Sequence, residues 1–118
     1  SGGPLVQHSL MAAMKIASKH NISIEKIVQK MCHAPAQRFS IVKRGYIRKG
    51  YWADMILVNP KAKHEVIKEN ILYKCGWSPF TGMTFDTEVT HTFVNGRLVY
   101  ENGNFDESSK GMALQFNR

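Results

Sequence analysis

Apolar side chains recur at three- and four-residue steps through the first third of the chain, which is the spacing of one face of an α-helix. This periodicity predicts a helix over residues 5–20, ended by Asn21, and a second helix over residues 23–32. The apolar face of the first helix comprises Val6, Leu10, Ala13, Met14 and Ala17. Ser23 is a favourable N-cap for the second helix, whose apolar stripe ends at Cys32 and is expected to be buried.

The pattern then changes to short runs separated by turn residues. Pro35 stands where the first residue of a short third helix would be, so we predict that helix over residues 35–39. Residues 54–58 are apolar after the first position and are followed by Asn59-Pro60. This arrangement predicts a buried strand that ends in a turn.

The last third of the chain carries the pattern of a β-hairpin. Residues 87–94 alternate between apolar and polar, and Asn95-Gly96 separates them from a second extended run over residues 97–100. Asn-Gly is the strongest two-residue hairpin signal, because a type I′ turn needs positive φ at both positions. A further turn is expected at residues 101–104.

Residues 61–86 show little regular pattern and are expected to form a long surface loop that lies against something else.

Composition and charge remove several classes of function. The 118 residues are 43% hydrophobic and 21% charged, which is the composition of a folding chain. The formal net charge is +7, and residues 1–63 carry 11 basic and two acidic side chains. The cations of the predicted helices fall opposite the apolar positions, as on a solvated face, so we expect no nucleic-acid partner.

The chain also lacks the patterns of membrane and secreted proteins. Its longest apolar run, residues 55–58, is far shorter than the roughly 20 residues that span a bilayer, and no signal-peptide pattern is present. Two cysteines are too few for a disulfide scaffold and favour a reducing compartment. We therefore expect a cytoplasmic protein with no membrane partner.

The residues with catalytic or metal-binding potential form no pattern of either kind. The histidines make neither an H-x-H nor an H-E-x-x-H pair. We expect all five to be surface or capping residues: His8, His20, His33, His64 and His91. Cys32 neighbours His33, but adjacent helical residues point about 100° apart, so we expect this cysteine to pack in the core rather than act as a nucleophile. An aromatic packing cluster is expected from Tyr73, Cys75, Trp77 and Phe80.

A glycine pair at the start of the chain is the one candidate for ligand binding. Gly2-Gly3 is too short to be a phosphate-binding fingerprint. Glycines just before a helix nevertheless let an anion approach the backbone N–H groups of the helix N-terminus. The alternative, which the residues leave open, is a simple turn.

Two stretches resemble segments of a known enzyme superfamily. Residues 45–58, GYIRKGYWADMILV, resemble the amidohydrolase signature G-x-I-x-x-G-x-x-A-D followed by four apolar residues. Residues 34–39, APAQRF, are similar to that superfamily's N-P-A-x-x-F turn, with Ala34 in place of the usual Asn. Residues 78–82 and 89–100 are similar to its hydantoinase-like branch.

Within that branch, residues 1–8 and 74–80 resemble dihydroorotases most closely. The resemblance implies an α/β fold. The chain would form the C-terminal part of a (β/α)8 barrel hydrolase that carries one or two zinc ions. Such an enzyme interconverts N-carbamoyl-L-aspartate and dihydroorotate in pyrimidine biosynthesis. A barrel takes about 250 residues, so this chain would be a C-terminal segment.

In that fold, residues 1–44 would be the terminal barrel loop and the last helices, and residues 45–118 would be strands of the small composite β-sandwich domain. The family's metal ligands lie upstream and have no counterpart in this chain. The segment by itself is therefore expected to bind no metal and to be inactive. We expect it to pair with the missing N-terminal part of the barrel or with a second copy of itself.

One binding position carries over from the family. The loop after the eighth barrel strand closes over the substrate, and Ser1-Gly2 fall on the residue–Gly pair that contacts it there. Gly3-Pro4 continue this loop. The resemblance thus implies that Ser1, Gly2, Gly3 and Pro4 bind substrate.

Three other interpretations stay open. The first is a sister cyclic amidase, such as a hydantoinase, dihydropyrimidinase or allantoinase, and the second is a non-catalytic relative with the same fold. The third, less favoured, is a basic nucleic-acid-binding domain, which retention on heparin and its salt dependence would test. Dihydroorotate carries a carboxylate, so a dihydroorotase should supply an arginine for it from the upstream segment. Intact upstream metal ligands would exclude the non-catalytic relative.

Overall fold

The computed structural model describes residues 2–117 and shows an α/β arrangement of short helices and two β-sheets. The chain divides into two compact units, each built from two separate stretches. Unit 1 comprises residues 1–23 and 59–88, and unit 2 comprises residues 24–58 and 89–118. No helix in the described part of the chain is long and apolar enough to cross a lipid bilayer.

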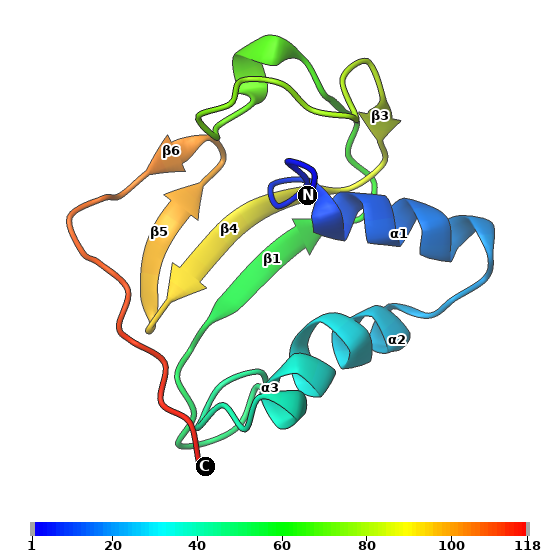
Figure 1. Cartoon of the computed structure of the whole chain (residues 1–118). Coiled ribbons are helices and arrows are strands. Elements are labelled where there is room, and N and C mark those ends of the chain that lie inside the picture. The colour runs from blue at the N-terminus through cyan, green and yellow to red at the C-terminus, as the bar shows by residue number, and fades with distance from the viewer. Residues whose placement is uncertain (1, 118) are drawn as a thin grey trace. The chain divides into compact units, whose positions relative to one another are not determined.

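Unit 1 packs one helix, α1 (Ser9–Lys19), against a two-stranded antiparallel ladder (Figure 1). The ladder joins β2 (His64–Glu65) to β3 (Thr84–Phe85), and the 3-10 turn η2 (Lys68–Asn70) lies between them in the chain. The buried centre of the unit consists of Met11, Val66 and Phe85.

The segment 61–86 is mostly the surface loop that the sequence suggests, but short regular elements interrupt it and two of its side chains belong to the buried centre. Val66 and Phe85 have no exposed surface. Beyond the ladder, Gly82 N–H donates to the carbonyl of Val66 (2.8 Å), and Val66 N–H donates to that of Met83 (2.9 Å). The segment does lie against another part of the chain, because its buried side chains pack on α1. Its regular elements are two or three residues long, which is too short for a periodicity to be recognised.

The first helix differs from its prediction in its start and in its packed face. It begins at Ser9, later than expected, after a turn that ends at His8. The side chains that pack inside unit 1 include His8 and Met11. Of the expected stripe, Ala17 is buried but Val6 is 84% exposed. The packed face includes these residues because Phe85 and Phe80 of segment 61–86 lie against them.

In unit 2 the predicted second and third helices form one continuous helical stretch. It consists of α2 (Ile24–Val28), the π-helical η1 (Gln29–His33) and α3 (Ala34–Arg38). Pro35 gives a reason for the π-helical turn. A proline inside a helix lacks an N–H and clashes with the carbonyl four residues earlier, and a wider turn just before it relieves that clash.

A four-stranded sheet has the strand order β1-β4-β5-β6 (Figure 1). Its strands are β1 (Met55–Asn59), β4 (Glu88–Val94), β5 (Arg97–Glu101) and β6 (Asn104–Phe105). Asn95-Gly96 joins the antiparallel strands β4 and β5, and φ values of 53° and 79° confirm the predicted turn. The second predicted turn is also confirmed, because Asn102-Gly103 joins β5 to β6.

The segment just before β1 holds the hairpin turn in place. The carboxylate of Asp54 accepts a hydrogen bond from Asn95 N–H (2.8 Å) and forms an ion pair with Arg44. The carbonyl of Ala53 accepts a second bond from Gly96 N–H (3.0 Å). The Ala-Asp step of the signature stretch therefore has a structural role: it anchors the turn that starts β5.

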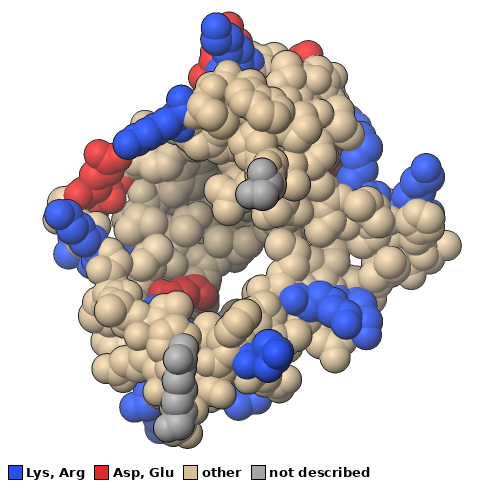
Figure 2. Space-filling view, in the orientation of Figure 1, with Lys and Arg blue, Asp and Glu red and all other residues tan. Residues whose placement is uncertain are grey.

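Much of the apolar surface of this sheet and of the unit 2 helices is open to solvent. Ile56 is 44% and Leu57 is 52% exposed, so the expected burial of β1 is wrong within this chain. Successive strand side chains point to opposite faces, so both faces of β1 are accessible. The α2–η1 stripe behaves likewise, since Ile27 is buried but Cys32 is exposed. Figure 2 shows uncharged side chains over most of the visible surface.

Candidate functional site in the N-terminal loop

The site suggested by the sequence lies in the N-terminal loop, which we define as residues 2–8; Ser1 lies outside the described residues. Two local hydrogen bonds shape this loop. Leu5 N–H donates to the carbonyl of Gly3 (2.9 Å), and His8 N–H donates to that of Leu5 (3.1 Å). The loop is thus a sequence of tight turns that leads into α1.

These turns change the expected role of the glycine pair. Because α1 begins at Ser9, Gly2 and Gly3 do not directly precede the helix N-terminus, as the sequence had suggested. At the start of the loop, the backbone N–H groups of Gly2 and Gly3 can donate hydrogen bonds, whereas Pro4 has no N–H. Gly2 is exposed and has a φ of 115°, a backbone conformation that favours glycine.

Two side chains tie the N-terminal loop to the end of η2 and to the residues that follow it. The amide of Gln7 bonds in both directions: Nε2 donates to the carbonyl of Asn70 (2.7 Å), and Oε1 accepts from Leu72 N–H (2.9 Å). The hydroxyl of Tyr73 donates to the carbonyl of Pro4 (2.8 Å). We call these three hydrogen bonds the loop clasp; they join residues 63, 65 and 69 positions apart.

His8 ends the loop inside the core of unit 1. It is the N-cap residue of α1, as one of its expected positions allows, but the expected surface position is wrong. It has no exposed surface and makes no side-chain cap to α1. Its ring stacks on Phe85, with centroids 6.2 Å apart, and meets Phe80 edge-on at 6.3 Å. Neither ring nitrogen has a hydrogen-bond partner among the described residues. Burial lowers the pKa of the His8 imidazole, and His64, 6.0 Å away, lowers it further.

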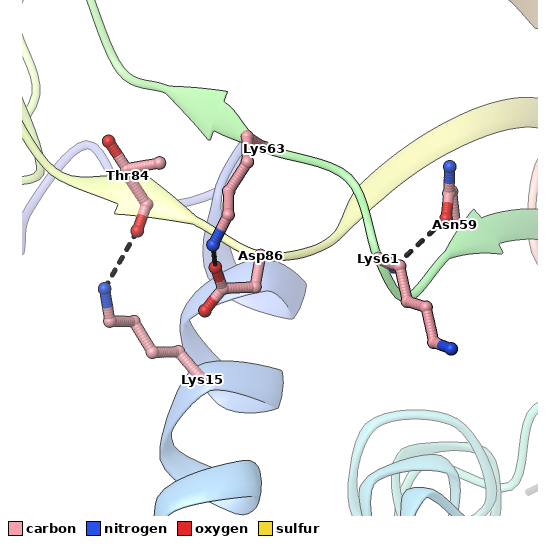
Figure 3. A network of polar contacts seen from close by, with 6 residues as sticks. All are labelled: Lys15, Asn59, Lys61, Lys63, Thr84 and Asp86. Carbon is pink, nitrogen blue, oxygen red and sulfur yellow. Dashed lines mark hydrogen bonds and ion pairs between the residues drawn. The ribbon is translucent and has the colours of Figure 1, made fainter.

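A polar network lies beside this cluster in unit 1 (Figure 3). The Lys15 ammonium donates to the carbonyl of Thr84 (2.8 Å) and lies 5.7 Å from the centre of the Phe85 ring. Lys63 forms an ion pair with Asp86, and this contact lowers the pKa of the Asp86 carboxyl. Both lysines are therefore engaged in contacts with unit 1 itself.

The other histidines occupy separate positions. His20 is the C-cap residue of α1, and His33 Nδ1 donates to a backbone carbonyl (2.7 Å). A nitrogen of His64 and one of His91 lie 3.7 and 3.4 Å from glutamate carboxylates. Within residues 2–117, no three His, Cys, Asp or Glu side chains come close enough together to hold a metal ion. The described residues therefore do not fit a metal centre, and they support no catalytic step through one.

The residues that hold the N-terminal loop were not predicted from the sequence. Gln7 and Tyr73 follow no periodicity, and their bonds reach across more than half the chain. His8 could have been recognised, because it stands three positions before Met11, on one helical face with that buried residue. Of the expected aromatic cluster, Tyr73 and Phe80 contact the N-terminal loop, whereas Trp77 is exposed.

Comparison with known proteins relates these features to one family. Residues 2–99 match the Amidohydrolase family. The allantoinase of Bacillus velezensis is 32% identical over 108 residues, which cover 92% of this chain and 23% of the relative. The dihydroorotase of Clostridium acetobutylicum is 32% identical over 91 residues, which cover 77% of this chain and 21% of the relative.

The structure is similar to that of the L-hydantoinase (dihydropyrimidinase) from Arthrobacter aurescens, with a TM-score of 0.67 and 28% identity over 75% of this chain and 20% of the other. The chain thus spans between 20% and 23% of the length of these three proteins. The family match includes the whole N-terminal loop and every residue of the loop clasp. On this match, the chain belongs to the amidohydrolase family.

Proposed function

We propose that this chain is part of a cytoplasmic cyclic amide hydrolase that interconverts N-carbamoyl-L-aspartate and dihydroorotate. One observation carries the choice of this substrate. The two segments with the strongest dihydroorotase character, residues 1–8 and 74–80, meet in unit 1, where His8 packs against Phe80. Sequence features that resemble one enzyme therefore belong to one local structure at the proposed site.

The same proposal accounts for the exposed apolar surface. In a (β/α)8 barrel enzyme, residues 1–44 would be the last barrel loop and helices, and residues 45–118 would belong to the small β domain. The upstream part of such a chain would cover side chains such as Ile47, which is 85% exposed, and Leu57. Covering them would remove apolar surface from water, which is favourable by about 25 cal/mol per Å².

The part played by this chain in catalysis would be to bind the substrate. The amides of Gly2 and Gly3 would donate hydrogen bonds to the anionic substrate, and the clasp would hold them in place. One or two zinc ions, bound by ligands upstream of this chain, would supply an activated water for attack on the amide. The chain itself contributes no metal ligand in this proposal.

The test is the activity of the intact protein that contains this chain. Purified protein is assayed on dihydroorotate, allantoin, hydantoin and a dihydropyrimidine, with the 118-residue chain alone as the control. We expect kcat/KM for dihydroorotate to exceed the others by about 100-fold or more, because a site that pairs a substrate carboxylate discriminates strongly against ligands without one. Preference for another cyclic amide would overturn the choice of substrate.

A second candidate is an allantoinase. The Bacillus velezensis allantoinase aligns with 92% of this chain, more than the 77% aligned by the Clostridium acetobutylicum dihydroorotase. Allantoin has no carboxylate, so an allantoinase would need no arginine upstream for that group. In the assay above, this candidate requires that allantoin be the preferred substrate. A protein inactive on all four compounds would favour the non-catalytic relative.

A further inference from the structure

The start of the N-terminal loop is held largely by polar contacts. Val6 is 84% exposed and contributes little apolar burial, and Leu5 is still 41% exposed. What connects residues 2–7 to the rest of unit 1 is the loop clasp, made by Gln7 and Tyr73. The position of Gly2 and Gly3 therefore depends on a few hydrogen bonds.

Gln7 is suited to this role by its chemistry. A carboxamide has both a donor and an acceptor, so one side chain can replace a peptide group beside an extended backbone. Gln7 bonds to the carbonyl of Asn70 and to the N–H of Leu72, the two backbone groups on either side of Ile71. Ile71 has an extended backbone, with φ of −81° and ψ of 120°. Glutamate lacks the donor and methionine lacks both groups.

Tyr73 acts one step closer to the proposed site. Its hydroxyl donates to the carbonyl of Pro4, the residue that directly follows the glycine pair. Pro4 has no N–H, so this carbonyl is the one backbone group of Pro4 that can be anchored by a hydrogen bond. The bond therefore fixes the end of the stretch whose amides would face the substrate.

The segment that bonds to Gln7 is itself anchored to the rest of unit 1 through Asn70. The side chain of Asn70 donates from Nδ2 to the carbonyl of Glu65 (2.7 Å) and accepts at Oδ1 from Ile67 N–H (3.1 Å). These bonds connect the segment to the end of β2, whose neighbour Val66 is completely buried. The clasp thus links the loop to the buried centre of unit 1.

From this geometry we propose that Gln7 and Tyr73 are positioning residues, which set substrate affinity by fixing the backbone of Gly2–Pro4 without touching the substrate. The inference rests on the proposed function of the N-terminal loop. It predicts that loss of a clasp bond loosens the loop and raises KM, while kcat stays nearly constant. A role in stability alone would leave both kinetic constants of the folded protein unchanged.

The experiment compares Tyr73→Phe and Gln7→Met with the wild type in the intact protein that contains this chain. Matched controls in unit 2 are Tyr100→Phe and Gln37→Met, the second of which removes a bond to the Tyr46 hydroxyl. The first measurement is amide hydrogen exchange of the peptide that covers residues 2–8, without substrate. The second is KM and kcat on the preferred cyclic amide, for variants whose thermal melts show a folded protein.

We expect both clasp variants to speed exchange in the loop peptide and to raise KM roughly fivefold, the change that one hydrogen bond is worth, whereas the controls do neither. Unchanged exchange in Tyr73→Phe would overturn the clasp, whatever the enzyme's substrate. Faster exchange with unchanged KM would overturn the positioning role and the assignment of this loop to the substrate. If Gln7→Met does not fold, Gln7→Glu replaces it, because it keeps the shape and the acceptor.

A failure of the proposed function would look different. If the intact protein hydrolyses none of the cyclic amides, the exchange measurement still decides whether the clasp holds the loop. In that case faster exchange supports the clasp as a structural feature, and the positioning role falls with the proposed activity.

Discussion

At the scale of single residues, the most consequential side chain is His8. It is completely buried against Phe85 and Phe80, and neither nitrogen has a partner among the described residues. A charged imidazole there would lose its hydration without gaining a hydrogen bond. The ring of His64 lies 6.0 Å away, and a positive charge there disfavours a second one on His8.

The stability of unit 1 should therefore fall with acidification. Unfolded His8 titrates near 6.5, and its folded pKa is lower. As the pH drops below 6.5, the unfolded chain takes up a proton before the folded chain does, so the free energy of unfolding decreases by at most about 1.4 kcal/mol per pH unit for this one group. The decrease levels off below the folded pKa. Denaturant unfolding at a series of pH values between 7.5 and 5 measures this slope.

The matched variants are His8→Phe and His20→Asn. His8→Phe removes the titrating group from the buried site and should flatten the slope, whereas His20→Asn changes an exposed histidine in the same unit and should leave it intact. Equal slopes in the wild type and in His8→Phe would show that His8 does not govern the pH response.

At the scale of elements, backbone conformation explains the signature stretch better than any chemistry does. Gly45 has a φ of 81°, and a Cβ there would lie 2.5 Å from Cβ of Ala36 and 2.9 Å from the carbonyl oxygen of Cys32. Glycine is thus required at this position by both conformation and space. The nearby Asp54 anchors the hairpin turn, so this stretch connects the helical part of unit 2 to the sheet.

The hairpin turn gives a direct test of that element. Gly96→Val should destabilise the chain by about 1 kcal/mol or more, because a β-branched residue would be forced to positive φ. A clash would not be the cause, because a Cβ at Gly96 would lie 3.9 Å from its nearest neighbour, Cβ of Ala53. Gly111→Val is the matched control, because Gly111 has no positive φ and no atom within 4 Å of a Cβ. Thermal melts of the two variants should differ, and equal melting temperatures would argue against a strained turn.

At the scale of the whole molecule, exposed apolar side chains and open strand edges dominate. β1 and β6 form the two edges of the four-stranded sheet, and an unpaired edge is a template for another chain. We therefore expect the isolated chain to self-associate. Light scattering should give a mass well above 13.4 kDa, and Leu57→Lys should lower it by placing a charge on the exposed strand β1. A compact monomer with little binding of an apolar-surface dye would contradict the view that an upstream segment covers these faces.

The metal chemistry of the proposed enzyme is also a property of the whole molecule. On the proposed function, the chain alone should bind no zinc stoichiometrically and hydrolyse no cyclic amide, because the metal ligands of the proposed enzyme would lie upstream of it. Calorimetry and metal analysis measure the binding, and the intact protein serves as the positive control. One equivalent of zinc bound by the isolated chain with micromolar affinity would contradict this expectation.

Features that depend on neighbours within a few residues could be predicted from the sequence. Helical periodicity located α1 and the α2–α3 stretch, and Asn95-Gly96 located the hairpin, because turn and helix preferences are local. The signature stretch indicated the family through contiguous residues alone. Element ends were less well predicted, since the start of α1 depends on contacts of His8 with residues far along the chain.

Burial and the partners of the N-terminal loop depend on contacts between distant parts of the chain. The expected stripe of α2 proved largely accessible, and the buried centre of unit 1 came from His8, Met11 and side chains of segment 61–86. Gln7 and Tyr73 acquired a role only when residues more than 60 positions away came beside them. The physical reason is that burial and long-range hydrogen bonds depend on which surfaces meet, and a local pattern of apolar positions does not specify its partner.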